Sequence, residues 1–406
     1  MDIDFDQEID HRGVNSIKWE FVIGKDGLRY WDLTDPELGD DQVLPMWVAD
    51  MDFTAAQPIV DVVTRRAARG LYGYASKTDS YLSSVAGWMQ RRKNWPIDVE
   101  WIVLTPGVVA ALHIMVRRFT APGDKVLIQR PVYHPFTYAI DTNNRQLVSS
   151  ALLLKGGRYE MDFEDLERKA ADPEVKLSIL CSPHNPVGRV WTEEELTQYA
   201  SICSKNDVLV IADEIHSDLI MPGQQFVCYG GLDEQLTHNS VVCTAPSKTF
   251  NVAGLQTSNI IVANSELRDE LKAELRANGL YGTNPFGLVG TEAAYNEGEP
   301  WLEQVIAYIW GNLQYLDSFL KRHVPRLRMI PIEGTYLAWV DCRELGLTDE
   351  ALDSMMMDHA KVYVDGGHMF GPEGQGFVRM NVACRRQTLE QALARIRQAV
   401  SELKAD

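Results

Sequence analysis

The chain has 406 residues, and its 57 acidic and 39 basic side chains give a formal charge of −18. Nucleic acids and anionic membranes are bound through clustered Lys and Arg, whereas the longest basic run here is Arg91-Arg92-Lys93. The composition therefore argues against both as partners. No apolar run approaches the ~20 residues that cross a membrane, and the first ten residues hold four Asp and one Glu where a signal peptide is basic. We expect a cytoplasmic protein.

Length and composition predict a globular protein of two or three domains. Hydrophobic residues make up 45% and charged residues 24% of the chain, which is ordinary for a globular protein. The six cysteines are scattered, with no Cys-x-x-Cys pair and no neighbouring histidine at metal-ligand spacing. We interpret them as small buried side chains rather than as metal ligands.

Between about residues 55 and 295, short β-branched runs alternate with amphipathic stretches, which predicts βα units and a parallel sheet. Strands are predicted at residues 125–129, 176–181, 208–212, 241–244 and 259–262, and helices at 107–119, 192–205 and 265–278. Thr192, followed by three glutamates, has the cap and the acidic first turn of a helix start. Polar segments follow several strands, where open α/β sheets bind ligands.

From about residue 297 the pattern changes to a separate α+β layer. Helices are predicted at 301–323, 349–360 and 388–404, and strands at 327–330, 335–340 and 376–382. We therefore predict a large domain of residues 55–296 and a smaller domain of residues 1–54 and 297–406.

Two residues at predicted strand ends indicate chemistry. Lys248 directly follows a β-run and precedes a glycine-containing turn, where an amine nucleophile is better placed than a solvated charge. Asp213 follows the strand at 208–212, and a buried carboxylate there needs a cation or a donor. A protonated pyridine nitrogen would be such a partner.

Two more strand ends carry suitable groups. Residues 182–189 (SPHNPVGR) follow a strand, and their two prolines present Asn185 rigidly. The turn at Thr105-Pro-Gly107 precedes a helix whose free N–H groups, at Val108 and Val109, suit a phosphate. Each segment alone is an ordinary turn, but all four of these sites lie at strand ends.

This order of phosphate turn, Asn loop, strand-end Asp and lysine resembles the fold-type I pyridoxal-phosphate enzymes. Within them the chain is similar to the MalY/PatB branch, the cystathionine β-lyase-like C–S lyases, from about Ser16 to the C-terminus. The matching motifs are residues 47–53 (WVADMDF), 131–136 (PVYHPF), 182–189, 212–217 (ADEIHS), 245–251 (APSKTFN) and 370–374 (FGPEG). The resemblance implies an α/β fold with a mainly parallel seven-stranded sheet between helices and a smaller α+β domain.

The resemblance also implies pyridoxal 5'-phosphate as cofactor. Lys248 would hold it covalently and then take the substrate's Cα proton, and Asp213 would keep its ring nitrogen protonated. Asn185 would hydrogen-bond the ring oxygen. The other implied cofactor contacts are Tyr133 on the ring face, His216 behind Asp213, and Ser247, Val108 and Val109 at the phosphate. Alternatively, His216 is a histidine that only packs against its neighbours.

Three further residues follow from the same resemblance. Tyr74 matches the tyrosine that reaches the partner's phosphate across a homodimer interface. Arg379, with Asn185, would bind the substrate carboxylate, for which the guanidinium fork is suited. Ala49, at the predicted edge of the site, is a further substrate-binding candidate.

Two positions depart from the aminotransferases of this fold. Gln256 stands eight residues after Lys248, where they usually carry a phosphate-binding arginine, and Ala245 replaces a serine. The phosphate site is therefore expected to depend on Ser247, the backbone and Tyr74, which fits the lyase branch.

We therefore predict a carbon–sulfur lyase that cleaves cystathionine or a related cysteine S-conjugate to a thiol, pyruvate and ammonia. A small sulfur-containing amino acid is the expected substrate. Alternatives are an aminotransferase using a 2-oxo acid, a lyase for a cysteine-conjugate S-oxide, and a non-enzymatic regulatory protein. An aminotransferase would use almost the same residues, so the sequence leaves this alternative open.

Overall fold

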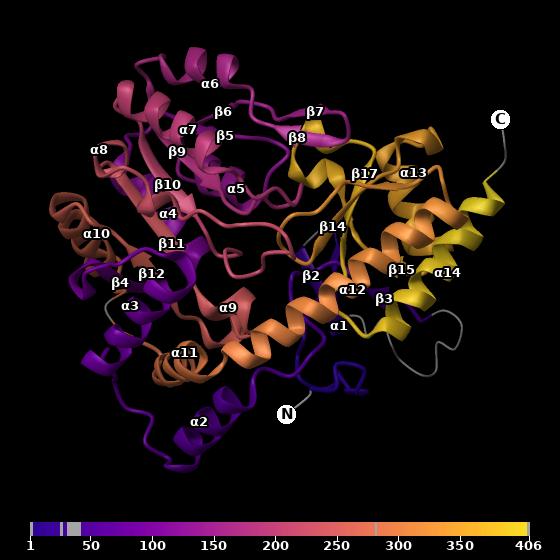
Figure 1. The fold of residues 1–406 in the computed structure, drawn as a ribbon, viewed down its shortest axis with the longest axis horizontal. Coiled ribbons are helices and arrows are strands. Elements are labelled where there is room, and N and C mark those ends of the chain that lie inside the picture. The colour runs from indigo at the N-terminus through magenta and orange to yellow at the C-terminus, as the bar shows by residue number, and fades with distance from the viewer. Residues whose placement is uncertain (1–2, 25–26, 31–41, 281, 404–406) are drawn as a thin grey trace.

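The computed structural model describes residues 3–24, 27–30, 42–280 and 282–403. Its largest element is a seven-stranded sheet in the order β4-β12-β11-β10-β9-β5-β6 (Figure 1). The strands are β4 (Ile102–Thr105), β5 (Lys125–Ile128), β6 (Gln146–Ser149), β9 (Val175–Cys181), β10 (Leu209–Asp213), β11 (Ser240–Thr244) and β12 (Ser258–Ile261). All are parallel except β12, which is antiparallel to both of its neighbours. The predicted mainly parallel α/β sheet is confirmed.

Helices cover both faces of this sheet, which explains why its strands are continuously apolar. Along β10, Leu209 and Ile211 belong to one hydrophobic core, whereas Val210 and Ala212 belong to another. One core includes α4 (Val108–Phe119), α5 (Pro135–Asp141) and α10 (Ser265–Ala277), and the other α6 (Phe163–Ala170) and α7 (Glu193–Lys205), which α8 (Glu234–Thr237) contacts. The helix start predicted at Thr192 is a capping box with Glu195.

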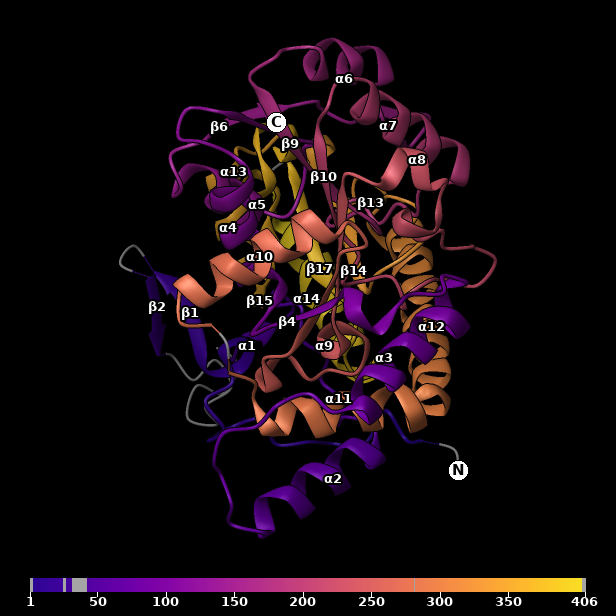
Figure 2. The ribbon, with the colours of Figure 1, turned by 90° about the vertical axis from the view of Figure 1, so that its left-hand side faces the viewer.

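A second sheet is antiparallel, in the order β13-β14-β17-β16, and its strands β14 and β17 lie behind the first sheet in the view of Figure 2. Its strands are β13 (Arg328–Met329), β14 (Leu337–Asp341), β16 (Asp365–Gly366) and β17 (Phe377–Asn381), and the helices in this part are α13 (Asp349–Ser354) and α14 (Arg386–Glu402). The helix predicted over 349–360 continues after α13 as a π-helical turn, Met355–His359.

Long helices and short pairings connect the two parts. α2 (Gln57–Ala68), α3 (Asp79–Lys93) and α11 (Pro285–Glu297) pack together, and α12 (Glu299–His323) runs from them to the second sheet (Figure 1). The remaining α-helices and β-strands of the described residues are α1 (Ile17–Glu20), β1 (Phe21–Gly24), β2 (Gly27–Tyr30), β3 (Leu44–Pro45), β7 (Leu153–Lys155), β8 (Arg158–Glu160), α9 (Pro246–Thr249) and β15 (Val362–Tyr363). β3 pairs with β15, so the N-terminal segment contacts the C-terminal part.

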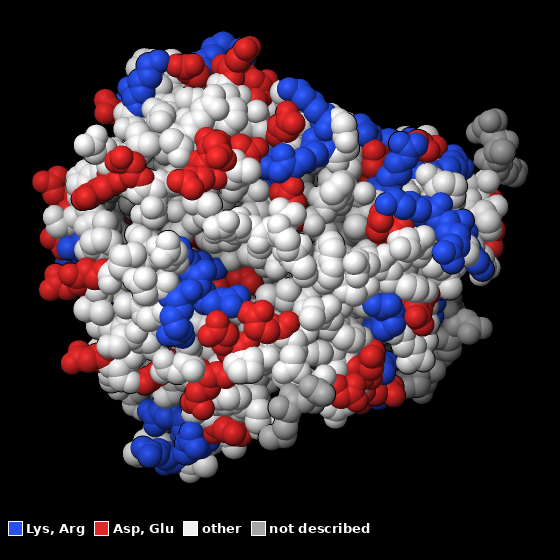
Figure 3. Space-filling view, viewed as in Figure 1, with Lys and Arg blue, Asp and Glu red and all other residues white. Residues whose placement is uncertain are grey.

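The surface carries acidic and basic side chains interspersed on the face shown in Figure 3. All six cysteines are buried and free, as predicted. Among the described residues, no helix is both long and apolar enough to cross a membrane.

Candidate active site

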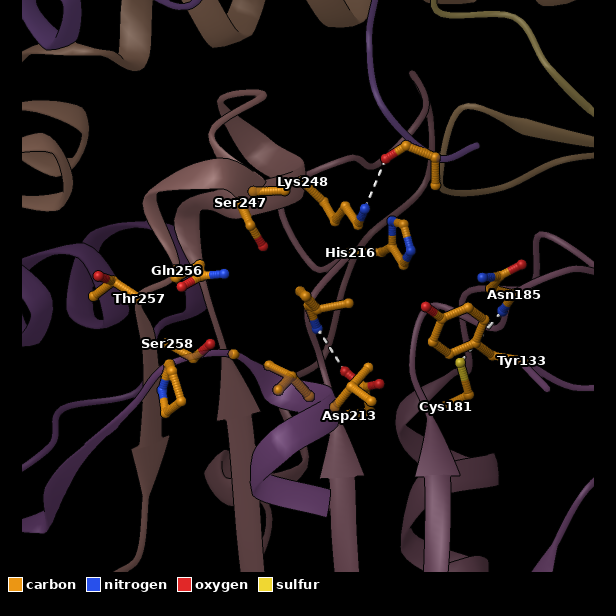
Figure 4. A pocket seen from close by; sticks show the side chains of 17 residues that line it. Tyr133, Cys181, Asn185, Asp213, His216, Ser247, Lys248, Gln256, Thr257 and Ser258 are labelled. Atoms are coloured by element: carbon orange, nitrogen blue, oxygen red, sulfur yellow. Dashed lines mark hydrogen bonds between the residues drawn. The ribbon is translucent and has the colours of Figure 1, made fainter. Parts of the chain in front are cut away.

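A cavity of about 190 Å³ opens at the edge of the large sheet where its parallel strands end (Figure 4). Most residues predicted for the site line it, namely Ala49, Val108, Val109, Tyr133, Asn185, Asp213, His216, Ser247 and Lys248. They are distant in sequence, and the parallel strands bring them together because successive carboxyl ends meet at one edge. Asp213 and Cys181 lie at the ends of neighbouring strands, β10 and β9.

Lys248 projects from α9, a single helical turn that follows β11. Its Nζ donates a hydrogen bond to the Ala49 carbonyl at 2.7 Å and lies 3.9 Å from Asp50 Oδ1. Burial lowers the pKa of Lys248, and the Asp50 carboxylate partly opposes that shift. A lowered pKa increases the neutral fraction of the amine, which is the nucleophilic form.

Asp213 is the last residue of β10 and is 4% exposed. Among the described residues its carboxylate accepts one hydrogen bond, from the Ile215 N–H at 3.2 Å, and has no ion-pair partner. Burial raises the pKa of Asp213 to about 7. The carboxylate is thus placed to receive a cation from within the cavity.

Two aromatic side chains beside Asp213 are held neutral by burial. The pKa of His216 is lowered to about 3 and that of Tyr133 is raised to about 12, in both cases chiefly by burial. His216 Nδ1 has no partner among the described residues, and its ring meets Tyr336 edge to face at 6.1 Å. The His216 side chain lines the cavity and is also packed, so both interpretations remain predictions.

Asn185 connects the cavity to Arg379. The Asn185 N–H donates to Cys181 Sγ at 3.3 Å, and its Oδ1 accepts from Arg379 Nη1 at 3.0 Å. Arg379, on β17 of the second sheet, is 3% exposed. We call this part of the cavity, with Asp213, His216 and Asn185, the ring end.

The opposite part, which we call the phosphate end, is formed by the start of α4. Val108 and Val109 are its first residues, and Gly107 before them has no side chain to cap their N–H groups. Ser247 lies here with Gln256, Thr257 and Ser258, and these last three were not among the predicted site residues (Figure 4). Unpaired N–H groups and hydroxyls at a helix N-terminus suit an anion.

Ser258 was missed because it begins a strand instead of ending one. β12 is antiparallel to its neighbours, and Ser258 pairs with Thr105, the last residue of β4. The start of β12 therefore lies at the same edge as the ends of the parallel strands. The order in which ligand-binding residues follow strands cannot reveal such a position.

Two predicted residues do not line the cavity: Arg379, which hydrogen-bonds Asn185 of the cavity wall, and Tyr74. The Tyr74 side chain is fully exposed, as are large parts of Leu71 (69%) and Tyr72 (63%). These last three residues form an exposed apolar segment, which we call the 71–74 segment.

Pyridoxal phosphate fits the groups present. A phosphate matches the uncapped start of α4, and an aldehyde matches the amine of Lys248. A protonated ring nitrogen matches Asp213, a buried carboxylate that has no cation partner among the described residues and that lines the cavity. The three complementary groups line one cavity.

The chain belongs to the aminotransferase class I and II family, whose model matches residues 48–396. It is similar to cystathionine beta-lyase PatB of Bacillus subtilis (41% identity, covering 98% of this chain and 100% of PatB) and to protein MalY of Escherichia coli (32%, covering 99% and 100%). The structure of the PLP-bound C–S lyase from Staphylococcus hominis superposes with a TM-score of 0.88 at 32% identity, covering 99% of each chain. The predicted fold-type I fold and the resemblance to the MalY/PatB branch are confirmed.

Proposed function

We propose that this protein is a pyridoxal-phosphate-dependent carbon–sulfur β-lyase. The observation that carries the proposal is the joint placement of two groups in one cavity with the uncapped start of α4: the Asp213 carboxylate at the end of β10 and the Lys248 amine on α9, which follows β11. The names of PatB and of the Staphylococcus hominis enzyme support lyase chemistry, since both are called lyases of this type.

The residues that line the site have different proposed roles in this reaction. Pyridoxal phosphate, when bound, supplies an electron-withdrawing ring that stabilises negative charge at the substrate's Cα. Asp213 holds a proton on the ring nitrogen, and Lys248 binds the cofactor and later takes the Cα proton. Arg379 and Asn185 bind the substrate carboxylate, with Ala49 beside them. Tyr133, His216, Ser247, Val108 and Val109 complete the cofactor contacts.

The overall reaction follows from loss of the Cα proton to Lys248. The electron pair left at Cα forms a double bond to Cβ, the Cβ–S bond breaks, and the sulfur leaves as a thiolate. The remaining 2-aminoacrylate takes up water and gives pyruvate and ammonia. L-cystathionine would yield homocysteine by this route.

A panel of substrates tests the proposal against its closest rival. L-cystathionine, an S-alkyl cysteine and its S-oxide are each incubated with and without a 2-oxo acid, and pyruvate and thiol are measured. A lyase releases both without the 2-oxo acid. Product formation that requires the 2-oxo acid, with the sulfur retained on the substrate, would instead establish an aminotransferase.

We further propose a homodimer in which Tyr74 reaches the partner's phosphate end. The exposed 71–74 segment supports an interface, because monomeric proteins seldom expose contiguous aromatic and aliphatic side chains.

We also propose the division into a large domain of residues 55–296 and a small one of the rest, because α12 begins at Glu299. Six free thiols support a cytoplasmic location.

A further inference from the structure

Arg379 carries a buried counter-charge that the sequence did not reveal. Asp365, on β16, stands directly opposite Arg379 in the antiparallel register with β17. Asp365 is 4% and Arg379 3% exposed, and Arg379 Nη2 donates to Asp365 Oδ2. The guanidinium of Arg379 is therefore already in contact with the Asp365 carboxylate when a substrate carboxylate arrives.

The remaining contacts of Arg379 fix the plane of the guanidinium. Nη1 donates to Asn185 Oδ1 at 3.0 Å, Nη2 also donates to the Trp47 carbonyl at 3.2 Å, and the group lies 4.9 Å from the centre of the Phe370 ring. Arg379 Nε is buried without a partner among the described residues. Of the three acceptors, only Asp365 is charged, so it contributes both to orientation and to the charge of the site.

We propose that Asp365 is a positioning residue that holds Arg379 in its receiving orientation and lowers the affinity of the site for the substrate carboxylate. The inference rests on the proposed role of Arg379 as the carboxylate-binding residue. A carboxylate docked on the same guanidinium comes close to Asp365, and like charges at such separations repel strongly when both are buried.

This arrangement has a consequence for the class of substrate. The carboxylate is bound in both the ground state and the transition state, so tight binding of it lowers KM without raising kcat. With that affinity reduced, an amino acid that offers only its α-ammonium and α-carboxylate occupies the site weakly. A substrate that also fills the cavity with a sulfur-bearing side chain gains binding that such amino acids lack.

Two variants of Asp365 separate charge from orientation. Asp365→Asn keeps an oxygen acceptor for Nη2 but removes the charge, and we expect KM for an S-alkyl cysteine to fall by about fivefold or more. Asp365→Ala removes both, and we expect KM to rise because the guanidinium loses an anchor. A residue with a merely structural role would raise KM in both variants or leave it unchanged.

The α-carboxamide of the same S-alkyl cysteine is the matched control ligand, because it lacks the carboxylate charge. We expect its affinity to be the same, within about twofold, for wild type and Asp365→Asn. The proposal would be overturned if Asp365→Asn gained the same affinity for the acid and for the carboxamide, or gained no affinity for the acid. Asp365→Ser is a second neutral variant with an acceptor oxygen, for use if Asp365→Asn does not fold, and the same gain is expected of it.

Binding without turnover keeps this test apart from the test of the lyase activity. Titration of the holoenzyme with L-alanine, followed by the cofactor absorbance, gives a dissociation constant. Tighter binding by Asp365→Asn in a protein that never releases pyruvate would support the role of Asp365 while refuting the lyase. An active lyase whose Asp365→Asn variant binds L-alanine no more tightly would refute the role of Asp365 alone.

Discussion

At the ring end of the cavity, Asp213, His216 and Asn185 are each more than nine-tenths buried, whereas at the phosphate end Val109 is 37% exposed and Gln256 is also exposed. Both ends are built on the same edge of one sheet. They differ in what covers them: the ring end is covered by Arg379 of the second sheet and by Tyr336 just before β14, while the phosphate end is exposed in the single chain at Val109 and Gln256.

This difference in burial separates the residues proposed to carry out the chemistry from those proposed to retain the cofactor. The groups proposed to move protons lie where burial shifts the pKa of Asp213 up and that of Lys248 down. The groups proposed to hold the phosphate lie where a second copy of the chain can still contribute. We therefore expect changes at the ring end to affect turnover, and changes at the phosphate end to affect cofactor affinity.

Replacement of Lys248 should have the largest effect. Lys248→Ala removes the amine proposed to take the Cα proton, and kcat for the release of pyruvate should fall by about 10³-fold or more. Added methylamine should restore part of the rate, because it can enter the space that the side chain leaves. Lys205→Ala, at a side chain 69% exposed on α7, should leave the rate unchanged. Turnover by Lys248→Ala near the wild-type rate would remove the lysine from the mechanism.

Replacement of Asp213 should have the next largest effect. Asp213→Asn has nearly the same shape but cannot keep the ring nitrogen protonated, so kcat should fall by about 10²-fold. The cofactor content of the purified variant, read from its absorbance, is measured alongside kcat. If the whole loss of rate disappears when excess cofactor is added, Asp213 serves retention and the distinction between the two ends fails.

Removal of the cofactor should change how stability depends on pH. Without a cation partner, the pKa of Asp213 is raised to about 7, so the folded apoprotein binds more protons than the unfolded chain between about pH 4 and 7. This part of its stability is therefore lost as pH rises through that window. With the ring nitrogen as partner, the carboxylate stays ionised and the loss disappears.

The measured quantity is the difference in thermal midpoint between holoprotein and apoprotein. We expect this difference to grow by a few degrees, on the order of 3 °C, from pH 5 to pH 7.5. In Asp213→Asn the difference in thermal midpoint should no longer grow with pH. The constant difference that remains comes from the other cofactor contacts. The same pH dependence in wild type and in the variant would show that Asp213 does not face the cofactor.

The smallest effects are expected at the phosphate end. Ser247→Ala and Tyr74→Phe should each weaken cofactor binding by about tenfold, the value of one hydrogen bond to a charged group, with little change in kcat at saturating cofactor. Dilution should distinguish the two residues, because Tyr74 is proposed to act only in a dimer and Ser247 within each chain. The contribution of Tyr74 to cofactor affinity should therefore disappear when the protein is diluted to monomers, whereas that of Ser247 should remain. An unchanged cofactor affinity in Tyr74→Phe would remove Tyr74 from the phosphate end.

Much of the ring end could be predicted from the sequence, because Asp213, Lys248 and the Asn185 loop each follow a recognisable apolar strand. Ser258 could not, since it begins the antiparallel β12. Asp365 lies on a strand of only two residues, too short to produce an alternating pattern. Its contact with Arg379 depends on the register between β16 and β17, which tertiary packing decides.

The release of products from L-cystathionine by the wild-type holoenzyme tests the central claim most directly. Homocysteine and pyruvate are measured over time in the absence of any 2-oxo acid. The proposed lyase releases the two in equal amounts over many turnovers. A protein that releases neither from L-cystathionine nor the corresponding thiol and pyruvate from any other cysteine S-conjugate would contradict the account.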